Sequence, residues 1–311
     1  MNIVITGGSG FVGSYLCEKL INDGHEIIVV DNLLTGSTEN INHLMHNENF
    51  SFIEHDVQNH IEIENKVDYV LHFASAASPK AYTEHPVNTL KAGSVGTINT
   101  LGLAKKHDAE YLLASTSEVY GDPLISPQTE EYWGNVNPNG ERSMYDEAKR
   151  FAEAAVATYS RSYDLKTKIV RIFNTYGPRM QLNDGRVVTN FIVQALKNEN
   201  ITIYGDGSQT RSFSYVEDTV AGIISLMNSS EYDVFNIGNP NEMTVGQLAE
   251  KIIELTDSTS EIKYLELPND DPKQRKPDIT KAKTKLNWEP KVNLEDGLTK
   301  TIKWVEEQLS K

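Results

Sequence analysis

The chain contains a single cysteine among its 311 residues, so it cannot form an internal disulfide bond. Extracellular proteins commonly depend on such bonds, whereas cytosolic proteins rarely contain them. The start of the sequence also lacks the basic and apolar segments of a secretory signal. No run of about 18 apolar residues is present that could span a membrane. We therefore expect a cytoplasmic protein with no membrane partner, in which Cys17 is a small core residue.

Basic residues are scarce relative to acidic ones. There are 29 Lys and Arg against 44 Asp and Glu, which gives a formal net charge of −15. Such an acidic chain is poorly suited to general binding of nucleic acid or of an anionic membrane surface. An anionic ligand must instead be held by a few local basic side chains and helix N-termini. No metal site is predicted.

The first half of the chain alternates expected strands and helices. Short apolar runs such as EIIVV and DYVLHF are typical of strands that are buried on both faces of a parallel sheet. Strands are predicted at 3–6, 26–31, 51–55, 69–73, 111–115 and 168–173, with helices at 13–22, 87–107 and 143–163. This order predicts an α/β fold, a Rossmann-type doubly wound parallel sheet with a smaller discontinuous C-terminal domain.

The segment VITGGSGFVGS places Gly7, Gly10 and Gly13 between the first strand and the first helix. In such a turn the first glycine permits the tight bend and the second lets the backbone approach a pyrophosphate. The third lets the helix pack closely on the strand. The pyrophosphate would lie at the helix N-terminus, where unpaired N–H groups and the helix dipole favour an anion. The segment therefore predicts a dinucleotide site.

Asp31 ends the second strand, near the spacing expected for a carboxylate that binds the adenosine ribose hydroxyls. A carboxylate there repels a 2′-phosphate, and the next residue is Asn32 rather than arginine, so NAD is predicted over NADP. Asp56 follows the third strand and could meet the adenine, although it could also simply cap a loop. Further cofactor contacts are predicted at Phe11, Val12, Asn32, Thr35, Gly36, Val57, Ser75 and Thr175.

The texture of the sequence changes after Gly177, where loop-like segments alternate with shorter expected elements. A helix is expected at 189–198, a core strand in VFNIGNP, and helices in TVGQLAEKIIEL and at 294–309. The predicted NAD-binding domain comprises residues 1–176 and about 214–238. The predicted substrate domain comprises 177–213 and 239–311.

The segment YDEAK places Tyr145 and Lys149 one helical turn apart. Such a pair is common on exposed helices, but here it follows a dinucleotide motif. A tyrosine with a pKa of about 10 is a poor base at neutral pH. A nearby ammonium group and the positive nicotinamide would lower that pKa. Thr116 could bind the same substrate hydroxyl, so the three residues are predicted to be catalytic.

Together these residues resemble the extended short-chain dehydrogenase/reductases that act on nucleotide sugars. The resemblance implies that Tyr145 takes the proton of the sugar 4-hydroxyl while hydride passes from C4 to NAD. It also implies that Lys149 holds the nicotinamide ribose. A homodimer joined through the helices at 87–107 and 143–163 is implied by the resemblance alone.

The segment LLASTSEVYGD decides among several reactions. Family members that resemble 4,6-dehydratases carry Asp-Glu after the threonine, whereas this chain has Ser117 and Glu118. Members that resemble 4-epimerases usually lack the glutamate. A third reaction fits better: if C6 is a carboxylate, the 4-ketone makes the sugar a β-keto acid that loses carbon dioxide. Ser117 and Glu118 could then orient the carboxylate and manage the proton. Dehydration and epimerisation remain alternatives, and intact Tyr145 argues against a non-catalytic NAD-sensing module.

The segment DDPKQRKPDI, with STSEVYGDP, RIFNTYGPRM, NDGRVV and GSQTRSF, resembles the UDP-glucuronate decarboxylase branch of that family, also called UDP-xylose synthases. The similarity extends over nearly the whole chain. It implies conversion of UDP-glucuronate to UDP-xylose with the hydride returned, and a role for Arg275 in decarboxylation. Without the resemblance, Arg275 could equally be a solvated charge in a polar loop.

The remaining candidates concern the sugar nucleotide. Guanidinium groups bind phosphate and carboxylate oxygens in pairs, which suits Arg186, Arg211 and Arg275, although Arg186 could instead reach the cofactor. Lys91 is a weaker candidate, since a solvated helical lysine fits nearly as well. The predicted substrate-binding residues are Lys91, Asn174, Arg186, Tyr204, Gln209, Arg211 and Arg275.

Overall fold

The computed structural model describes residues 1–266 and 274–311. Its centre is a seven-stranded sheet with the order β11-β6-β5-β4-β1-β2-β3, in which every neighbouring pair is parallel. The strands are β1 (Asn2–Thr6), β2 (Glu26–Asp31), β3 (Phe50–Glu54), β4 (Tyr69–His72), β5 (Glu110–Thr116), β6 (Thr167–Ile172) and β11 (Val234–Ile237). All six strands predicted in the first half of the chain are confirmed, with ends that differ by one residue at most.

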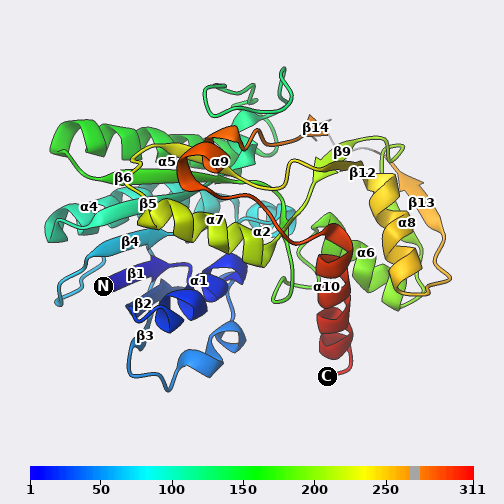
Figure 1. The fold of residues 1–311 in the computed structure, drawn as a ribbon, viewed down its shortest axis with the longest axis horizontal. Coiled ribbons are helices and arrows are strands. Elements are labelled where there is room, and N and C mark those ends of the chain that lie inside the picture. The colour runs from blue at the N-terminus through cyan, green and yellow to red at the C-terminus, as the bar shows by residue number, and fades with distance from the viewer. Residues whose placement is uncertain (267–273) are drawn as a thin grey trace.

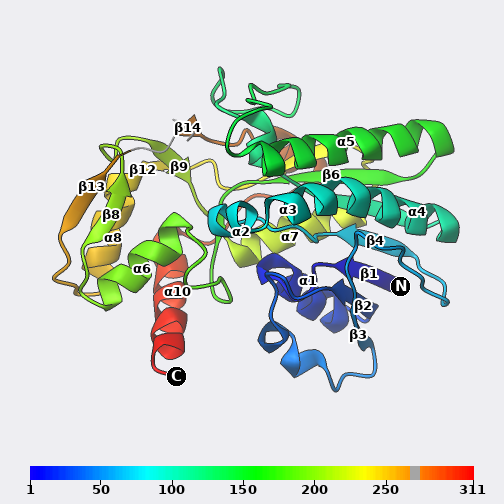
Figure 2. The ribbon, with the colours of Figure 1, turned by 180° about the vertical axis from the view of Figure 1, so that it is seen from behind.

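Helices cover both faces of the sheet, so the predicted doubly wound α/β fold is confirmed. One face carries α1 (Phe11–Asn22) and α7 (Val216–Asn228), as Figure 1 shows. The other carries α3 (Pro86–Lys91), α4 (Thr97–His107) and α5 (Ser143–Tyr163), seen in Figure 2. The central strands lie between two apolar layers, which explains their nearly continuous apolar sequences. Cys17 is buried in this core as predicted.

The helix expected at 87–107 is divided by a π-helical segment, Ala92–Gly96, between α3 and α4. Close packing accompanies this irregular turn. A methyl group on Gly93 would come within 2.7 Å of the Ala148 side chain on α5, and one on Gly96 equally close to Val57. The sequence gives the helical period but not this contact between helices, so the irregular turn was not predicted. Ala92 and the preceding Asn88 and Thr89 line the large cavity described below.

A smaller part of the molecule lies beyond the carboxyl ends of the sheet strands (Figures 1 and 2). Its helices are α6 (Val187–Leu196), α8 (Val245–Leu255) and α10 (Leu294–Leu309). Its strands are β8 (Ile201–Tyr204), β9 (Thr210–Ser212), β12 (Glu242–Thr244), β13 (Ile262–Leu265) and β14 (Gln274–Arg275). The shorter elements elsewhere are α2 (Pro79–Glu84), α9 (Thr280–Leu286), β7 (Thr175–Tyr176), β10 (Ser214–Tyr215) and the 3-10 turns 38–40, 42–44 and 117–120.

Local sequence signals account for the helix boundaries in this smaller part. The Thr244 hydroxyl accepts a hydrogen bond from the backbone of Gln247, whose side chain bonds back to Thr244, so α8 begins with a capping box. Asn293 caps α10 by accepting from the Asp296 backbone at 2.8 Å. The predicted helix at 294–309 is confirmed at both ends.

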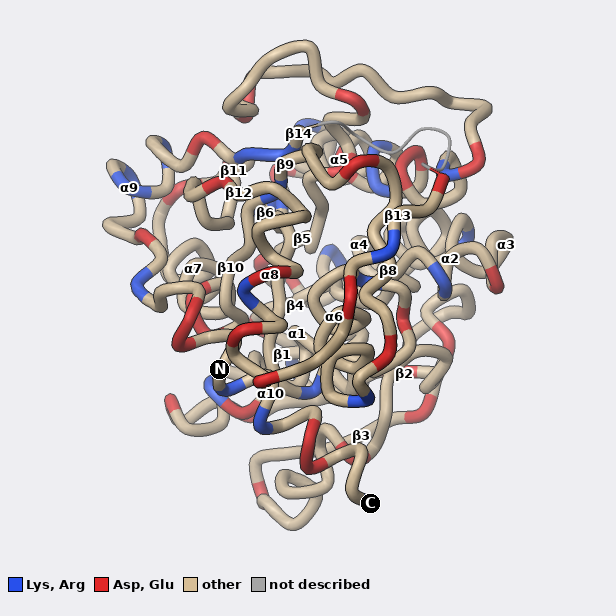
Figure 3. The backbone as a smooth tube through the Cα atoms, turned by 90° about the vertical axis from the view of Figure 1, so that its right-hand side faces the viewer, with Lys and Arg blue, Asp and Glu red and all other residues tan. Residues whose placement is uncertain are grey.

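Two surface properties bear on the function classes considered above. On the side that Figure 3 shows, acidic and basic residues are interspersed along the described backbone. Among the described residues, no helix is both long and apolar enough to cross a membrane.

Gly13 provides a test of how tightly α1 is held against the glycine turn. A methyl group at this position would lie 2.2 Å from the Gly7 carbonyl oxygen. We expect Gly13→Ala to lower the free energy of unfolding by about 1–3 kcal/mol. It should also weaken NAD binding, because the N-terminus of α1 must move. Thermal unfolding with and without NAD measures both effects.

Gly102→Ala is the matched control for this experiment. Gly102 lies within α4, and a methyl group there meets no atom within 4 Å. Since alanine is favoured over glycine in a helix by about 1 kcal/mol, this variant should be at least as stable as the natural protein. Equal destabilisation of the two variants would contradict the packing argument.

Candidate active site

One large cavity, of about 1140 Å³, lies between the carboxyl ends of the sheet strands and the smaller part of the molecule. Ligands of open parallel sheets bind at this edge, where the strand order reverses. Of the predicted site residues, all except Lys91 line this cavity. The volume suits two sizeable ligands at once, since sites for single small molecules usually measure about 300–1,000 Å³.

Lys91 is the exception. It is exposed on α3, while its neighbour Ala92 lines the cavity. Lys91 is not among the residues that line the cavity, and its role in substrate binding remains a prediction.

The glycine turn has the predicted backbone geometry. Gly7 has a φ of +74°, and a methyl group there would collide with the backbone at Ala74. The Gly10 N–H donates to the Gly7 carbonyl at 3.1 Å, which closes the turn. Helix α1 then begins without a side-chain cap, so its first N–H groups face the cavity. An anionic pyrophosphate is the group that such a helix start favours.

Asp31 and Asp56 mark the ends of β2 and β3 at one side of the cavity. The Asp31 carboxylate accepts hydrogen bonds from the backbone N–H groups of Ser9 (3.0 Å) and Leu33 (2.9 Å), which fix it against the glycine turn. Asp56 accepts from the Gln58 backbone and from the Asn32 side chain. Asp56 therefore caps its loop and lines the cavity as well, so the two readings of this residue are compatible.

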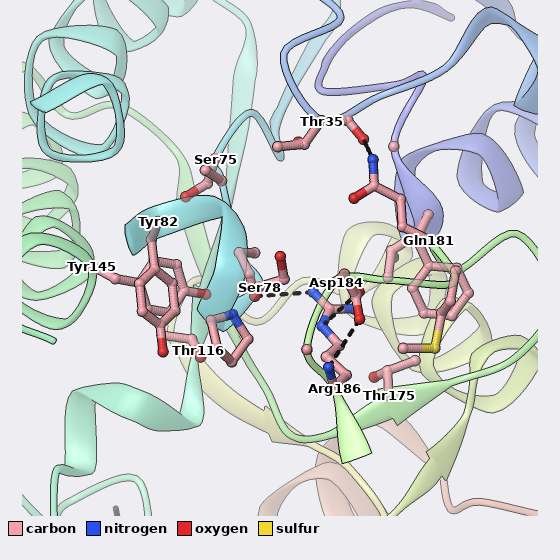
Figure 4. A pocket seen from close by; sticks show the side chains of 18 of the residues that line it. Thr35, Ser75, Ser78, Tyr82, Thr116, Tyr145, Thr175, Gln181, Asp184 and Arg186 are labelled. Atoms are coloured by element: carbon pink, nitrogen blue, oxygen red, sulfur yellow. Dashed lines mark hydrogen bonds and ion pairs between the residues drawn. The ribbon is translucent and has the colours of Figure 1, made fainter. Parts of the chain in front are cut away.

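Tyr145 and Lys149 project from the first two turns of α5 toward the end of β5. The ring of Tyr82, on α2, stacks on Tyr145 with ring centres 5.3 Å apart, and Thr116 lies beside the pair (Figure 4). The Thr116 hydroxyl is a hydrogen-bond partner of the Tyr145 hydroxyl. The Lys149 ammonium donates to the Ala114 carbonyl at 2.8 Å. The predicted trio of Thr116, Tyr145 and Lys149 is thus brought together.

The protein groups alone do not lower the pKa of Tyr145. Burial raises it to about 12, and the hydrogen bond from Thr116 opposes this only in part. Burial lowers the pKa of Lys149 to about 8, although the Glu153 carboxylate acts in the opposite sense. The expectation that a neighbouring ammonium lowers the tyrosine pKa is therefore not met by Lys149. The other positive charge expected to lower the pKa of Tyr145 is the nicotinamide of bound NAD.

Glu118 lies at the centre of a buried charge cluster. Its Oε2 atom is 2.5 Å from Arg142 Nη2 and 3.2 Å from Arg275 Nη2. Burial alone would raise the pKa of Glu118, but the guanidinium groups of Arg275, Arg142 and Arg211 hold it below its usual range. Glu118 is therefore ionised at neutral pH, and it orients two cations at the wall of the cavity.

Arg275 is 1% exposed, although it lies in a loop that the sequence describes as polar. It reaches the end of β5 from the smaller part of the molecule, donating to the Ser117 carbonyl and to the Gly121 carbonyl at 3.0 Å. Residues 267–273, which include the DDPK part of the quoted segment, lie outside the described residues. Arg275 is thus a buried cation paired with Glu118 rather than a solvated charge.

Sequence reasoning missed two members of this cluster, Arg142 and Asp146. Both flank Tyr145 in RSMYDEAK, where alternating charges resemble an ordinary helix start. Asp146 is only 8% exposed, and its Oδ1 atom has no hydrogen-bond partner. Burial raises its pKa to about 7, Glu118 adds to the rise, and Arg142 and Arg275 oppose it. The only sequence signal for Arg142 and Asp146 was their proximity to Tyr145, which is predicted to be catalytic.

The remaining residues predicted to bind the phosphates and the base also line the cavity. Arg186 donates to the Ala77 carbonyl at 3.0 Å and is paired with Asp184 (Figure 4). Tyr204 is half exposed, and its carbonyl accepts from the Gln209 side chain at 2.6 Å. Arg211 pairs in register with Arg275 through strands β9 and β14. Asn174 follows β6 and also lines the cavity.

No metal centre is evident in the described part of the chain, where no three His, Cys, Asp or Glu side chains are grouped to hold an ion.

Comparisons with known proteins place the chain in a family. A family model described as GDP-mannose 4,6 dehydratase matches residues 4–301. UDP-glucuronic acid decarboxylase 1 of Xenopus tropicalis is 53% identical over 307 residues, covering 99% of this chain and 72% of that protein. The structure of UDP-glucose 4-epimerase from Thermotoga maritima with UDP-glucose is similar at a TM-score of 0.92 and 34% identity, covering 99% of this chain and 100% of that one.

A further structure relates to the cofactor. UDP-glucuronic acid 4-epimerase from Bacillus cereus, in complex with UDP-glucuronic acid and NAD, is similar at a TM-score of 0.89 and 26% identity, covering 99% of this chain and 100% of that one. The fold and the Tyr145, Lys149 and Thr116 site define the class, the extended short-chain dehydrogenase/reductases. Within that class, the chain belongs to the UDP-glucuronic acid decarboxylase family.

Asp146 generates a prediction on stability. An acid with a higher pKa in the folded protein than in the unfolded chain binds its proton more tightly when folded. Its contribution to the free energy of unfolding is therefore fully present below about pH 4 and is lost as the pH rises to about 7. We expect Asp146→Asn to remove this loss and to stabilise the protein by about 1–4 kcal/mol at about pH 8, but not at about pH 4. Chemical denaturation at the two pH values measures the difference.

Asp206→Asn is the control. Asp206 is exposed, and hydrogen bonds from the Ser208 side chain and backbone lower its pKa. Because the sign of this shift is opposite, the control should gain no stability at the higher pH. A pH-independent effect of Asp146→Asn would contradict the assignment.

Proposed function

We propose that the protein is an NAD-dependent UDP-glucuronate decarboxylase that forms UDP-xylose through a 4-keto intermediate. The observation that carries the proposal is the contact of Glu118 with Arg142 and Arg275, in the same cavity as Tyr145 and Thr116. This contact places two kinds of group in one cavity. One can oxidise a sugar hydroxyl, and the other consists of cations that can hold a sugar carboxylate.

The oxidation half of the site has its groups at the end of β5 and on α5. Tyr145 accepts the proton of the sugar 4-hydroxyl, and Thr116 holds the tyrosine hydroxyl in place. Bound NAD would accept the hydride from C4 and later return it, so the overall reaction consumes no reductant. Its binding groups are the glycine turn with the start of α1 for the pyrophosphate, Asp31 for the ribose and Lys149 for the nicotinamide ribose. Asp31 favours NAD over NADP because it repels a 2′-phosphate.

The decarboxylation half requires no metal and no leaving-group acid. In the 4-keto sugar the C5–C6 bond breaks, its electron pair moves toward the C4 carbonyl, and carbon dioxide leaves. Arg275 and Arg142 can hold the substrate carboxylate in alignment for this step, since guanidinium groups bind carboxylates in pairs. Glu118 is paired with both cations. The enolate then takes a proton at C5, for which Ser117 and Glu118 can position a water molecule.

The alternatives remain those of the same fold. A 4,6-dehydratase would need an acid beside Glu118 to protonate the leaving 6-hydroxyl, and this position is Ser117. A 4-epimerase reaction would not require Glu118 and two arginines next to C5. The similarity to both epimerase structures is compatible with the proposal, because the oxidation half is common to all three reactions. A non-catalytic NAD-binding module would not account for the buried Tyr145, Lys149 and Thr116.

Several parts of the proposal concern the organisation of the protein. The NAD-binding domain would comprise 1–176 with about 214–238, and the substrate domain 177–213 with 239–311. A cytoplasmic homodimer joined through α3, α4 and α5 would cover large apolar side chains that are exposed there: Val87, Leu90, Val95, Ile98 and Phe151. In the substrate domain, Arg186, Arg211, Asn174, Tyr204 and Gln209 would bind the diphosphate and uracil.

Incubation of the purified protein with UDP-glucuronate, without and with added NAD, tests the activity. We expect nuclear magnetic resonance to show UDP-xylose with no net formation of NADH. UDP-4-keto-pentose with stoichiometric NADH would keep decarboxylation and remove the return step. Formation of UDP-galacturonate instead would identify an epimerase and overturn the proposal.

Tyr145→Phe tests the base. Removal of the hydroxyl should lower kcat by about 10²–10⁴-fold, the usual contribution of a general acid or base. NAD binding should be retained, because Phe keeps the stacking on Tyr82. Turnover and NAD titration measure the two effects, and Tyr159→Phe on the same helix is the matched control. Full turnover by Tyr145→Phe would contradict this mechanism.

A further inference from the structure

Arg275 must be placed accurately, yet it belongs to a two-residue strand. Its backbone is attached on one side to β9, where Arg275 pairs with Arg211 and the Ser212 hydroxyl donates to the Arg275 carbonyl at 3.4 Å. Its side chain extends to the carbonyls after β5. A second attachment, on the residues that follow Arg275, comes from Gln128 in the loop between β5 and α5.

Gln128 is 0% exposed and bonds to three backbone groups of the segment 276–278. The Lys276 N–H donates to the Gln128 side-chain oxygen at 2.9 Å. The Gln128 N–H donates to the Lys276 carbonyl at 2.8 Å, and the Asp278 N–H donates to the Gln128 carbonyl at 2.8 Å. The Gln128 side-chain amide is itself fixed by donating to the Ile125 carbonyl at 2.7 Å.

A line of buried groups connects Gln128 to the catalytic helix. Asn236, on β11, donates to the Gln128 and Asp278 carbonyls at 3.0 and 3.2 Å. The Tyr120 hydroxyl donates to the Asn236 side-chain oxygen at 2.8 Å and accepts from Arg171 at 2.9 Å. Arg171 is bound through two nitrogens to Glu153, two helical turns after Tyr145. Glu153 also accepts from the Ser115 hydroxyl, one residue before Thr116.

These contacts link the two halves of the site through the protein interior. At one end are Ser115 on β5 and Glu153 on α5, which hold the elements of Thr116 and Tyr145. At the other end is the backbone directly after Arg275. Each group in the line has a hydrogen-bond partner on both sides, and buried networks of this kind are rigid when fully satisfied.

We propose that Gln128, supported by Asn236 and Tyr120, is a positioning residue that sets Arg275 against the substrate carboxylate and thereby controls decarboxylation. Gln128 does not line the cavity, so it acts through Arg275 and not on the substrate. The inference rests on the proposed decarboxylation and extends it to a residue outside the cavity. Loosening Gln128 should leave oxidation at C4 largely intact, because Tyr145 and Thr116 are held by α5 and β5.

Gln128→Met tests the inference, because it keeps the side-chain volume and removes both side-chain hydrogen bonds. We expect release of carbon dioxide from UDP-glucuronate to slow by on the order of 10- to 100-fold, the usual cost of a small misplacement of a catalytic group. Enzyme-bound NADH should accumulate at the same time, since oxidation continues while the next step is slow. Carbon dioxide release from carboxyl-labelled substrate and NADH absorbance are followed in the same reaction.

Gln194→Met is the matched control. The Gln194 side chain also accepts from a strand backbone, that of Thr202 at 3.1 Å, and donates to the Thr202 hydroxyl at 2.8 Å, but it has no contact with the Arg275 segment. It should leave the ratio of carbon dioxide release to NADH formation unchanged. NADH formation by Gln128→Met shows that the variant is folded. Tyr120→Phe, which removes one hydroxyl from the line, should shift the ratio in the same direction by a smaller factor and supplies the test if Gln128→Met is insoluble.

A double-mutant cycle with Arg275→Ala separates positioning from a general loss of structure. If Gln128 acts through Arg275, Gln128→Met should add little to the defect of Arg275→Ala. Independent, multiplying defects or equal losses of NADH formation and carbon dioxide release would overturn the inference. A natural protein that releases no carbon dioxide overturns the proposed function and this inference with it. An active natural protein with an unaffected Gln128→Met overturns the inference alone.

Discussion

The contact of the Glu118 carboxylate with Arg142 and Arg275 is the interaction on which the site depends. Three charged groups meet at the end of β5, where the Arg275 side chain is 1% exposed and those of Glu118 and Arg142 are 18% and 21% exposed. Arg275 could not remain there without an anionic partner, since an unpaired buried charge is strongly unfavourable. Each comes from a different segment: Glu118 from the turn after β5, Arg142 from the start of α5, and Arg275 from the smaller part of the molecule. The same ion pairs therefore join the smaller part to the sheet and assemble the site.

The sheet and the charge cluster contribute different parts of the site. The parallel strands bring the glycine turn, Asp31, Thr116 and Asn174 to one edge because all their carboxyl ends lie on the same side. This arrangement is common to dehydrogenation, epimerisation and dehydration of nucleotide sugars. In the proposed reaction, the arginines around Glu118 would bind the carboxylate at C6. Chemistry at C4 and chemistry at C5 would then be controlled by different segments of the chain, which only the fold brings together.

The burial of Tyr145 and Lys149 has opposite consequences for their pKa values. It raises that of the tyrosine to about 12 and lowers that of the lysine to about 8. Both shifts disfavour the charged forms on which proton transfer depends, because each ionised group loses hydration. A further positive charge near Tyr145 would stabilise its phenolate and lower its pKa. The nicotinamide ring of the proposed cofactor carries such a charge, so binding of the cofactor and activation of the base would be coupled.

The sequence by itself determined the order of the elements, the glycine turn, the ends of α5 and α10 and the trio of Thr116, Tyr145 and Lys149. These features depend on local periodicity, on capping and on residues a few positions apart, which the chain records directly. Only the tertiary structure decided that Arg275 is buried against Glu118, that Arg142 and Asp146 belong to the cluster, and that Lys91 does not line the cavity. It also placed the irregular turn after α3 and the line from Glu153 to Gln128. The reason is physical: burial, pairing and pKa depend on contacts between separate segments, 24 residues apart for Glu118 and Arg142 and 157 apart for Glu118 and Arg275. A pattern along the chain does not contain those distances.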